Sequence, residues 1–210
     1  MAGPASADVT GTTSTSDVVL YAHCQQHPID YDLQVGPLTG PWRVEFQVAD
    51  PKGDTSEGTV LNSADNPPTS GTFTYTFCGS EPLGTYTVRA TVRYAPVNLE
   101  VPLPSTTFQV RPTATRATLA QTALGHGRYR LDARVTEETE TGFGKADGVS
   151  VRIERLVHGK WTRIRGTALT TVRGTAATTV RGRPGTRLRA VVPTRNNYAG
   201  STSKPVTLGR

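Results

Sequence analysis

Apolar side chains recur at every second position in the main apolar runs of this chain, whereas the three-to-four-residue recurrence of an amphipathic helix is not sustained anywhere. The clearest run is 42–48, in which Trp, Val, Phe and Val alternate with Arg, Glu and Gln. Successive side chains of a β-strand point to opposite faces, so this spacing places the apolar residues on one buried face. Gly and Pro interrupt the runs, as is typical of short strands joined by turns. The sequence therefore predicts an all-β fold.

The expected strands fall into two series. In the first series they are 18–21, 29–35, 42–48, 73–77, 86–92 and 108–110, with a turn at 50–54 and a long polar stretch at 55–70. In the second series they are 118–122, 129–135, 149–156, 161–164, 168–172, 176–180, 188–192 and 205–208. A β-sandwich has about 100 residues, so a chain of 210 residues has room for two.

The charge of the chain changes sign at Arg111-Pro112. Residues 1–111 hold 5 Lys and Arg against 11 Asp and Glu, a net charge of −6, whereas residues 112–210 hold 18 against 6, a net charge of +12. Pro112 fixes its own backbone and restricts its neighbour, which suits a short stiff joint. We therefore expect a residual tail at 1–7, an acidic sandwich at 8–111 and a basic sandwich at 112–210.

Several motifs in the second half carry a family resemblance. After Gly148 an alternating strand turns through Gly159 and reaches Trp161, a second strand follows, and Gly174–Val180 has the pattern Gly-x-Ala-x-x-x-Val. These motifs resemble bacterial immunoglobulin-like domains common in actinobacterial extracellular proteins, and 186–193 and 198–203 resemble the last strands of that family. The resemblance covers roughly 113–210 and implies a bacterial origin and an immunoglobulin-like β-sandwich there. Because the strand series occurs twice, we expect two tandem immunoglobulin-like β-sandwiches. Such domains serve as spacers, adhesins and binding modules alike.

The first half is similar to the same superfamily through Gly84-Thr85-Tyr86. In sandwiches, a tyrosine at the entry to a late strand can donate a hydrogen bond from its hydroxyl back to the backbone at the strand corner. We expect Tyr86 to do so. The cysteines are placed differently from those of antibody domains, because Cys24 precedes an alternating strand and Cys78 ends one. The usual inter-sheet bridge with a stacked Trp is therefore not expected.

Export is indicated by two features. Ala5-Ser6-Ala7 before Asp8 has the small-x-small shape of a signal-peptide cleavage site. Two cysteines in an exported chain most simply form one disulfide, here between Cys24 and Cys78. We expect a protein that is secreted, extracellular or displayed on a cell surface. No run of about 18 apolar residues is present, so no membrane span is expected.

Two rival roles for Cys24 remain at this stage. His23, Cys24 and His27 could bind a metal, but they provide only three ligands, and a structural zinc site needs four. A catalytic thiol with His23 as its base is disfavoured, because adjacent side chains on an extended chain point to opposite faces.

The basic half suggests a binding surface. We take as its candidate face the residues Arg152, Arg163, Arg165, Arg181, Arg187, Arg189 and Trp161. An anionic cell-envelope polymer such as teichoic acid, or a protein partner, is the expected ligand, and self-association of acidic half with basic half is an alternative. Nucleic acid is not expected, because the arginines alternate singly along strands without a nucleic-acid-binding motif.

Catalysis has no support in the sequence. None of the 4 histidines lies in a nucleophile-elbow, zinc-helix or triad signature, and no glycine-rich phosphate loop is present, so neither an enzyme nor a cofactor is expected. The prediction is a secreted, non-enzymatic binding or structural protein. One alternative is a protease inhibitor that presents the Pro-rich loop 63–70, held by the nearby disulfide. Another is an adhesion module stiffened by calcium, for which Asp50, Asp54 and Glu57 are weak ligand candidates, and no other metal site is expected.

Overall fold

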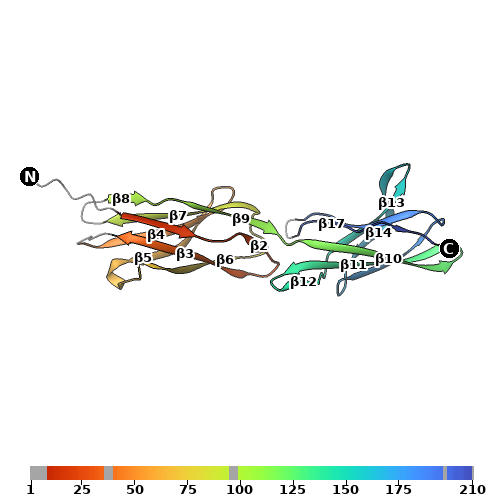
Figure 1. Cartoon of the computed structure of the whole chain (residues 1–210), viewed down its shortest axis with the longest axis horizontal. Coiled ribbons are helices and arrows are strands. Elements are labelled where there is room, and N and C mark those ends of the chain that lie inside the picture. The colour runs from red at the N-terminus through yellow and green to blue at the C-terminus, as the bar shows by residue number, and fades with distance from the viewer. Residues whose placement is uncertain (1–8, 36–39, 95–98, 196–197, 210) are drawn as a thin grey trace, which may run out of the picture. The chain divides into compact units, whose positions relative to one another are not determined.

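A computed structural model describes residues 9–35, 40–94, 99–195 and 198–209, which are mostly β-strand (Figure 1). Within these ranges the helical structure is limited to a 3-10 turn at Ser63–Asp65, which confirms the all-β prediction. The chain divides into two compact units, the first ending at Arg111 and the second beginning at Pro112. The division falls at the same peptide bond as the change in charge.

The first unit is built from two sheets. One sheet has the order β1 (Val9–Ser14), β3 (Gln25–Val35) and β6 (Ser70–Phe77). The other has the order β2 (Val18–Leu20), β9 (Thr106–Pro112), β7 (Gly84–Tyr94), β4 (Trp42–Ala49) and β5 (Thr55–Asn62), with β8 (Leu99–Pro102) also paired to β7.

The second unit is also built from two sheets. One has the order β10 (Thr115–Gly125), β11 (Arg128–Thr139) and β12 (Gly142–Lys145), and β15 (Thr175–Arg181) pairs with the other edge of β11. The other has the order β14 (Lys160–Thr170), β13 (Ser150–Val157), β16 (Arg187–Val192) and β17 (Ser201–Thr202), and β18 (Val206–Thr207) also pairs with β16.

Both units distribute their main strands in the same way. The first, second and fifth strands form one sheet, and the third, fourth, sixth and last form the other. This division between two packed sheets is the immunoglobulin-like arrangement. The prediction of two tandem immunoglobulin-like sandwiches is therefore confirmed.

Each unit has a separate apolar core made by alternate residues of its strands. On β4, Val44, Phe46 and Val48 are buried, whereas Arg43 and Gln47 are exposed. The core of the first unit is rich in aromatic rings, and that of the second is mainly aliphatic. The period-two pattern thus reflects strands with one face in the core and the other in solvent, as the sequence indicated.

Some strands were not predicted. β5 falls in the stretch expected to be a long polar loop. It is an edge strand that pairs with β4, and it has few apolar residues, so its sequence lacks the alternation that marks the other strands. The expected strands 161–164 and 168–172 are largely one strand, β14. A bulge interrupts its pairing, since Glu154 pairs with Arg163 whereas Arg152 pairs with Ala168.

Tyr86 forms the predicted corner. Its side chain is fully buried in the first core, and its hydroxyl donates a hydrogen bond to the carbonyl oxygen of Pro82 at 3.0 Å. Burial, reinforced by the charge of Glu81, raises the pKa of Tyr86, so the hydroxyl remains a donor at neutral pH. The bond fixes the chain where it enters β7.

Replacing Tyr86 with Phe should weaken the first unit alone. The Y86F variant keeps the ring but loses the hydrogen bond, which lowers the free energy of unfolding by about 1 kcal/mol. Calorimetry should show the melting transition of the first unit shifted down by about 4–8 °C. The matched control is Y129F, since Tyr129 donates to the carbonyl of Gly209 at 2.7 Å, and it should shift the transition of the second unit instead. Unchanged transitions in Y86F would contradict this role.

Candidate functional site

The predicted disulfide is confirmed between Cys24 and Cys78. The two cysteines lie just beyond Gln25 and Phe77, which pair across β3 and β6, so the bridge joins neighbouring strands of one sheet at their ends. Both sulfur atoms are consumed by the bridge, which rules out a thiolate metal ligand and a catalytic thiol at Cys24.

The two histidines near Cys24 have structural roles. His27 is buried, its ring stacks on Phe108 at 5.6 Å, and its Nε2 atom lies 2.6 Å from the hydroxyl of Thr15. The ring of His23 stacks on Tyr21 at 5.7 Å. Burial lowers the pKa of His27, and this effect outweighs a hydrogen bond with the backbone of Ser16 that raises it. His27 is thus a neutral residue of the first core.

The calcium candidates form a turn. One oxygen of the Asp50 carboxylate accepts backbone hydrogen bonds from Lys52 at 2.8 Å and from Asp54 at 2.9 Å. Glu57 lies on β5, and its side chain is outside the described part of the structure. Across the described residues, no group of three His, Cys, Asp or Glu side chains gathers as a metal ligand set. Closing the turn accounts for the position of Asp50.

The loop at 63–70 is not held by the disulfide, contrary to the expectation for an inhibitor. The loop precedes β6, whereas Cys78 follows that strand. A strand of 8 residues is about 27 Å long, so the bridge lies at the far end. The loop is instead attached through Ser63, whose hydroxyl accepts a hydrogen bond from the backbone of Trp42 at 3.0 Å.

A groove of about 730 Å³ lies in the first unit beside Trp42 and Tyr94. Its two arginines are engaged by acids within the protein. Arg43 and Arg93 both contact Glu45, at 3.0 and 3.6 Å. Arg93 also contacts Glu100, at 3.0 Å. This groove therefore has no excess charge to attract an ion.

The candidate arginines of the second unit do not all share one face. Arg181 lies on β15, in the other sheet, and Arg165 lies in the bulge of β14. The sequence could not separate them, because strand alternation does not show which sheet a strand joins. The remaining candidates lie on the strands β13, β14 and β16 of one sheet: Arg152, Arg163, Arg187, Arg189 and Trp161. We call the outer surface formed by these five residues and Glu154 the arginine–tryptophan face.

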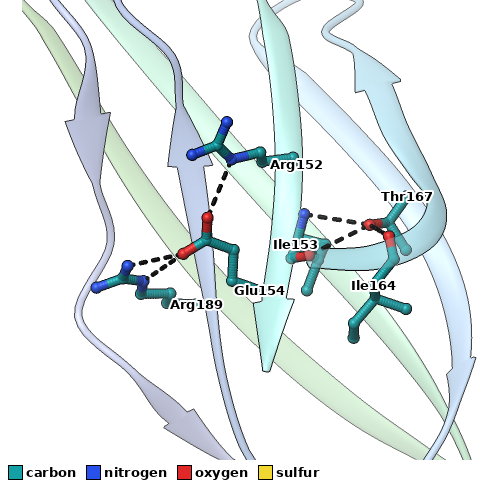
Figure 2. A network of polar contacts seen from close by, with 6 residues as sticks. All are labelled: Arg152, Ile153, Glu154, Ile164, Thr167 and Arg189. Atoms are coloured by element: carbon teal, nitrogen blue, oxygen red, sulfur yellow. Dashed lines mark hydrogen bonds and ion pairs between the residues drawn. The ribbon is translucent and has the colours of Figure 1, made fainter. Parts of the chain in front are cut away.

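Glu154 is the organising residue of this face, and sequence reasoning missed it. Figure 2 shows its carboxylate between two guanidinium groups. Arg152 donates from Nε to one oxygen at 3.0 Å, and Arg189 donates to the other from Nε at 2.9 Å and from Nη2 at 2.7 Å. The Glu154 side chain is only 8 % exposed, so removing one partner would leave a poorly solvated charge. The available signal was Arg152 and Glu154 two positions apart, which places opposite charges on one face of a strand.

Two further contacts fix the face. The guanidinium carbon of Arg189 lies 4.3 Å from the centre of the Trp161 ring, a cation–π contact. The buried hydroxyl of Thr167 donates to the carbonyl of Ile164 at 2.7 Å and accepts from the backbone N–H of Ile153 at 3.3 Å (Figure 2). Thr167 thereby attaches the bulge of β14 to β13, next to the position of Arg163.

The arrangement can bind an anion. The arginine–tryptophan face contains four arginines and one carboxylate, so it keeps a positive excess. Arg152 and Arg189 retain N–H groups that Glu154 does not use, and Arg163 and Arg187 are exposed. A hollow of about 460 Å³ beside Arg187 is also lined by Arg155 and His158. The chemistry suits carboxylate, sulfate or phosphate groups.

Comparison with known proteins gives little. No family model matches the chain, and no curated protein matches it. A marsupial T cell receptor is similar in structure, with 12 % identity and a TM-score of 0.39 over 96 % of this chain and 62 % of that chain. This chain therefore spans less than two thirds of the receptor chain.

No helix in the described ranges is both long enough and apolar enough to cross a membrane.

The stability of the first unit should fall as the pH is lowered through the titration of histidine. The folded-state pKa of His27 is below its ordinary value of 6.5, so the unfolded chain binds the proton first. The contribution of His27 to the stability of the first unit is therefore complete above pH about 6.5 and decreases below it. Denaturant unfolding between pH 7.5 and 5 measures this, with H27F as the control that should lose His27's share of the pH dependence. An equal pH dependence in H27F would contradict the assignment.

Proposed function

We propose that this chain is a secreted or cell-surface bacterial protein of two immunoglobulin-like modules, non-enzymatic, whose basic second unit binds an anionic polymer on the arginine–tryptophan face. The disulfide supports an oxidising compartment, since such bonds are rare in the cytosol. The motifs around Trp161 and Gly174 support the bacterial assignment, through their resemblance to extracellular immunoglobulin-like domains.

The fixed pair Arg152 and Arg189 is the observation that carries the proposal. A long flexible side chain loses conformational freedom when it binds a ligand, which weakens binding. Glu154 holds both guanidinium groups in place, and the Trp161 ring supports that of Arg189. Much of this ordering is therefore complete before an anion arrives.

The net charge of the second unit supports a polymer over a small anion. A net charge of +12 over residues 112–210 attracts a polyanion from a distance and raises the rate of association. A polymer can also contact fixed and exposed arginines together, for example Arg152, Arg163 and Arg187. Many weak contacts along one chain then add to useful affinity.

Removing the exposed arginines of this face should weaken binding of inorganic polyphosphate to the full chain. We expect R163Q/R187Q to raise the Kd about tenfold, because two charge contacts of up to about 1 kcal/mol each are lost. The salt dependence of Kd should also become shallower. Fluorescence anisotropy at several salt concentrations measures both.

The matched control is K52Q/R89Q, which removes the same charge from exposed positions of the first unit. It should leave the Kd almost unchanged. Equal weakening in the two double variants would show that net charge alone drives binding, and no weakening in either would exclude the arginine–tryptophan face.

A further inference from the structure

A second basic surface lies on the other sheet of the second unit. Outward residues of β11 alternate with the buried residues Tyr129, Leu131 and Ala133. We call this surface the threonine–arginine face. It comprises Arg128, Arg130, Asp132 and Arg134 on β11, Thr118 and Thr122 on β10, and Thr175, Thr179 and Arg181 on β15.

The arrangement on this face is regular. Arg134 lies between Thr118 and Thr175, and Arg130 lies between Thr122 and Thr179, in the register of the three strands. Positions two apart on a strand are separated by about 6.7 Å, so arginine heads recur along β11 at this spacing or its double. Arg128, Arg130 and Arg134 thus lie in a row along β11, and threonine hydroxyl groups flank Arg130 and Arg134 on both sides.

The charges of this face are mostly unpaired. Arg130 contacts Asp132 at 3.0 Å, but among the described residues Arg128, Arg134 and Arg181 form no ion pair. Arg128 also lies directly opposite Arg181 in the β11–β15 register. Like charges directly opposite one another destabilise a sheet. A bound anion would remove this repulsion, whereas the fold by itself gains nothing from it.

The equivalent sheet of the first unit shows that the fold does not require these arginines. There the central strand β3 has Asp30 and Asp32 at outward positions. Asp32 lies between Thr12 and Ser70, so hydroxyl groups again flank the central charge. The same scaffold thus has opposite charge in the two units, and the basic version is a property of the second unit.

We propose that the threonine–arginine face binds an extended phosphodiester polymer without bases, such as a poly(glycerol phosphate) chain. The phosphates of such a chain are six bonds apart, and since three backbone bonds span about 3.8 Å, the repeat is about 7 Å. This repeat matches the spacing of Arg128 and Arg130, and twice the repeat matches the spacing of Arg130 and Arg134. The threonine hydroxyls can donate to phosphate oxygens and accept from polyol hydroxyls. The proposal rests on the proposed function and adds a second site with a defined ligand class.

Two other occupants fit less well. Single-stranded nucleic acid is bound by stacking of bases on aromatic rings, and none of the residues of this face is aromatic. The nearby Phe143 lies on β12, where the guanidinium of Arg116 covers its ring at 3.6 Å. A second copy of the chain would bury about 350 Å² on the row from Arg128 to Arg134, estimated from strand spacing. A specific interface needs about 800 Å² per partner.

The test uses the full chain with a labelled poly(glycerol phosphate) oligomer and a poly(dT) oligomer of equal charge. We expect R128Q/R134Q/R181Q to bind poly(glycerol phosphate) at least tenfold more weakly than the wild type. The slope of log K against log salt should decrease in magnitude by about 2, as expected for three lost phosphate contacts. The control R43Q/K52Q/R89Q removes three positive charges from the first unit and should bind like the wild type.

Folding is checked by the melting transition of the second unit, which should not fall, because the substitutions relieve the Arg128–Arg181 repulsion. Wild-type affinity in the triple variant would overturn the inference, as would tighter binding of poly(dT) than of poly(glycerol phosphate). Concentration-dependent sedimentation of the wild type, lost in the triple variant and unaffected by the polymer, would identify a second copy instead. If one of these contrary results is found while R163Q/R187Q still weakens polyphosphate binding, only the inference about the threonine–arginine face fails. If R163Q/R187Q does not weaken polyphosphate binding either, the proposed function fails as well.

Discussion

Successive side chains of a β-strand point to opposite faces, and this constraint separates fold from function in this protein. The inward residues, such as Val44 and Phe46 in one unit and Leu131 and Ile153 in the other, make the two cores. The outward residues contribute little to those cores and can change without loss of the fold. The two units share one strand order but have opposite outward charge, as Asp30 and Arg130 illustrate. The charge division is therefore a property of surfaces rather than of architecture.

Glu154 is the exception that gives one of these surfaces a fixed geometry. It lies at an outward position, yet it is buried beneath Arg152 and Arg189. Charged residues that bury one another need complete pairing, so these three side chains are held in one arrangement by their mutual hydrogen bonds. The two basic faces consequently differ in kind. The arginine–tryptophan face is preorganised by internal contacts, whereas the threonine–arginine face has the Arg130–Asp132 ion pair and is otherwise ordered by the spacing of its strands.

Much of the fold was predictable because inward apolar residues repeat visibly in the sequence. The Tyr86 corner and the Cys24–Cys78 disulfide were also predictable, because each depends on residues with distinctive chemistry. Edge strand β5 was missed, because an edge with polar residues resembles a loop. The separation of Arg181 from Arg163 was missed because sheet membership depends on pairing between distant segments. Glu154 was missed because its burial arises only when β13 and β16 lie side by side.

The central claim is that the second unit presents its outward arginines to an anionic polymer. The most direct measurement is NMR of the arginine Nε–Hε groups in the full chain during titration with poly(glycerol phosphate). We expect shifts at Arg128, Arg134 and Arg181 of one face and at Arg152, Arg163, Arg187 and Arg189 of the other, and none at Arg43 or Arg89 in the first unit. Shifts of equal size in both units, or shifts confined to the first unit, would contradict the claim.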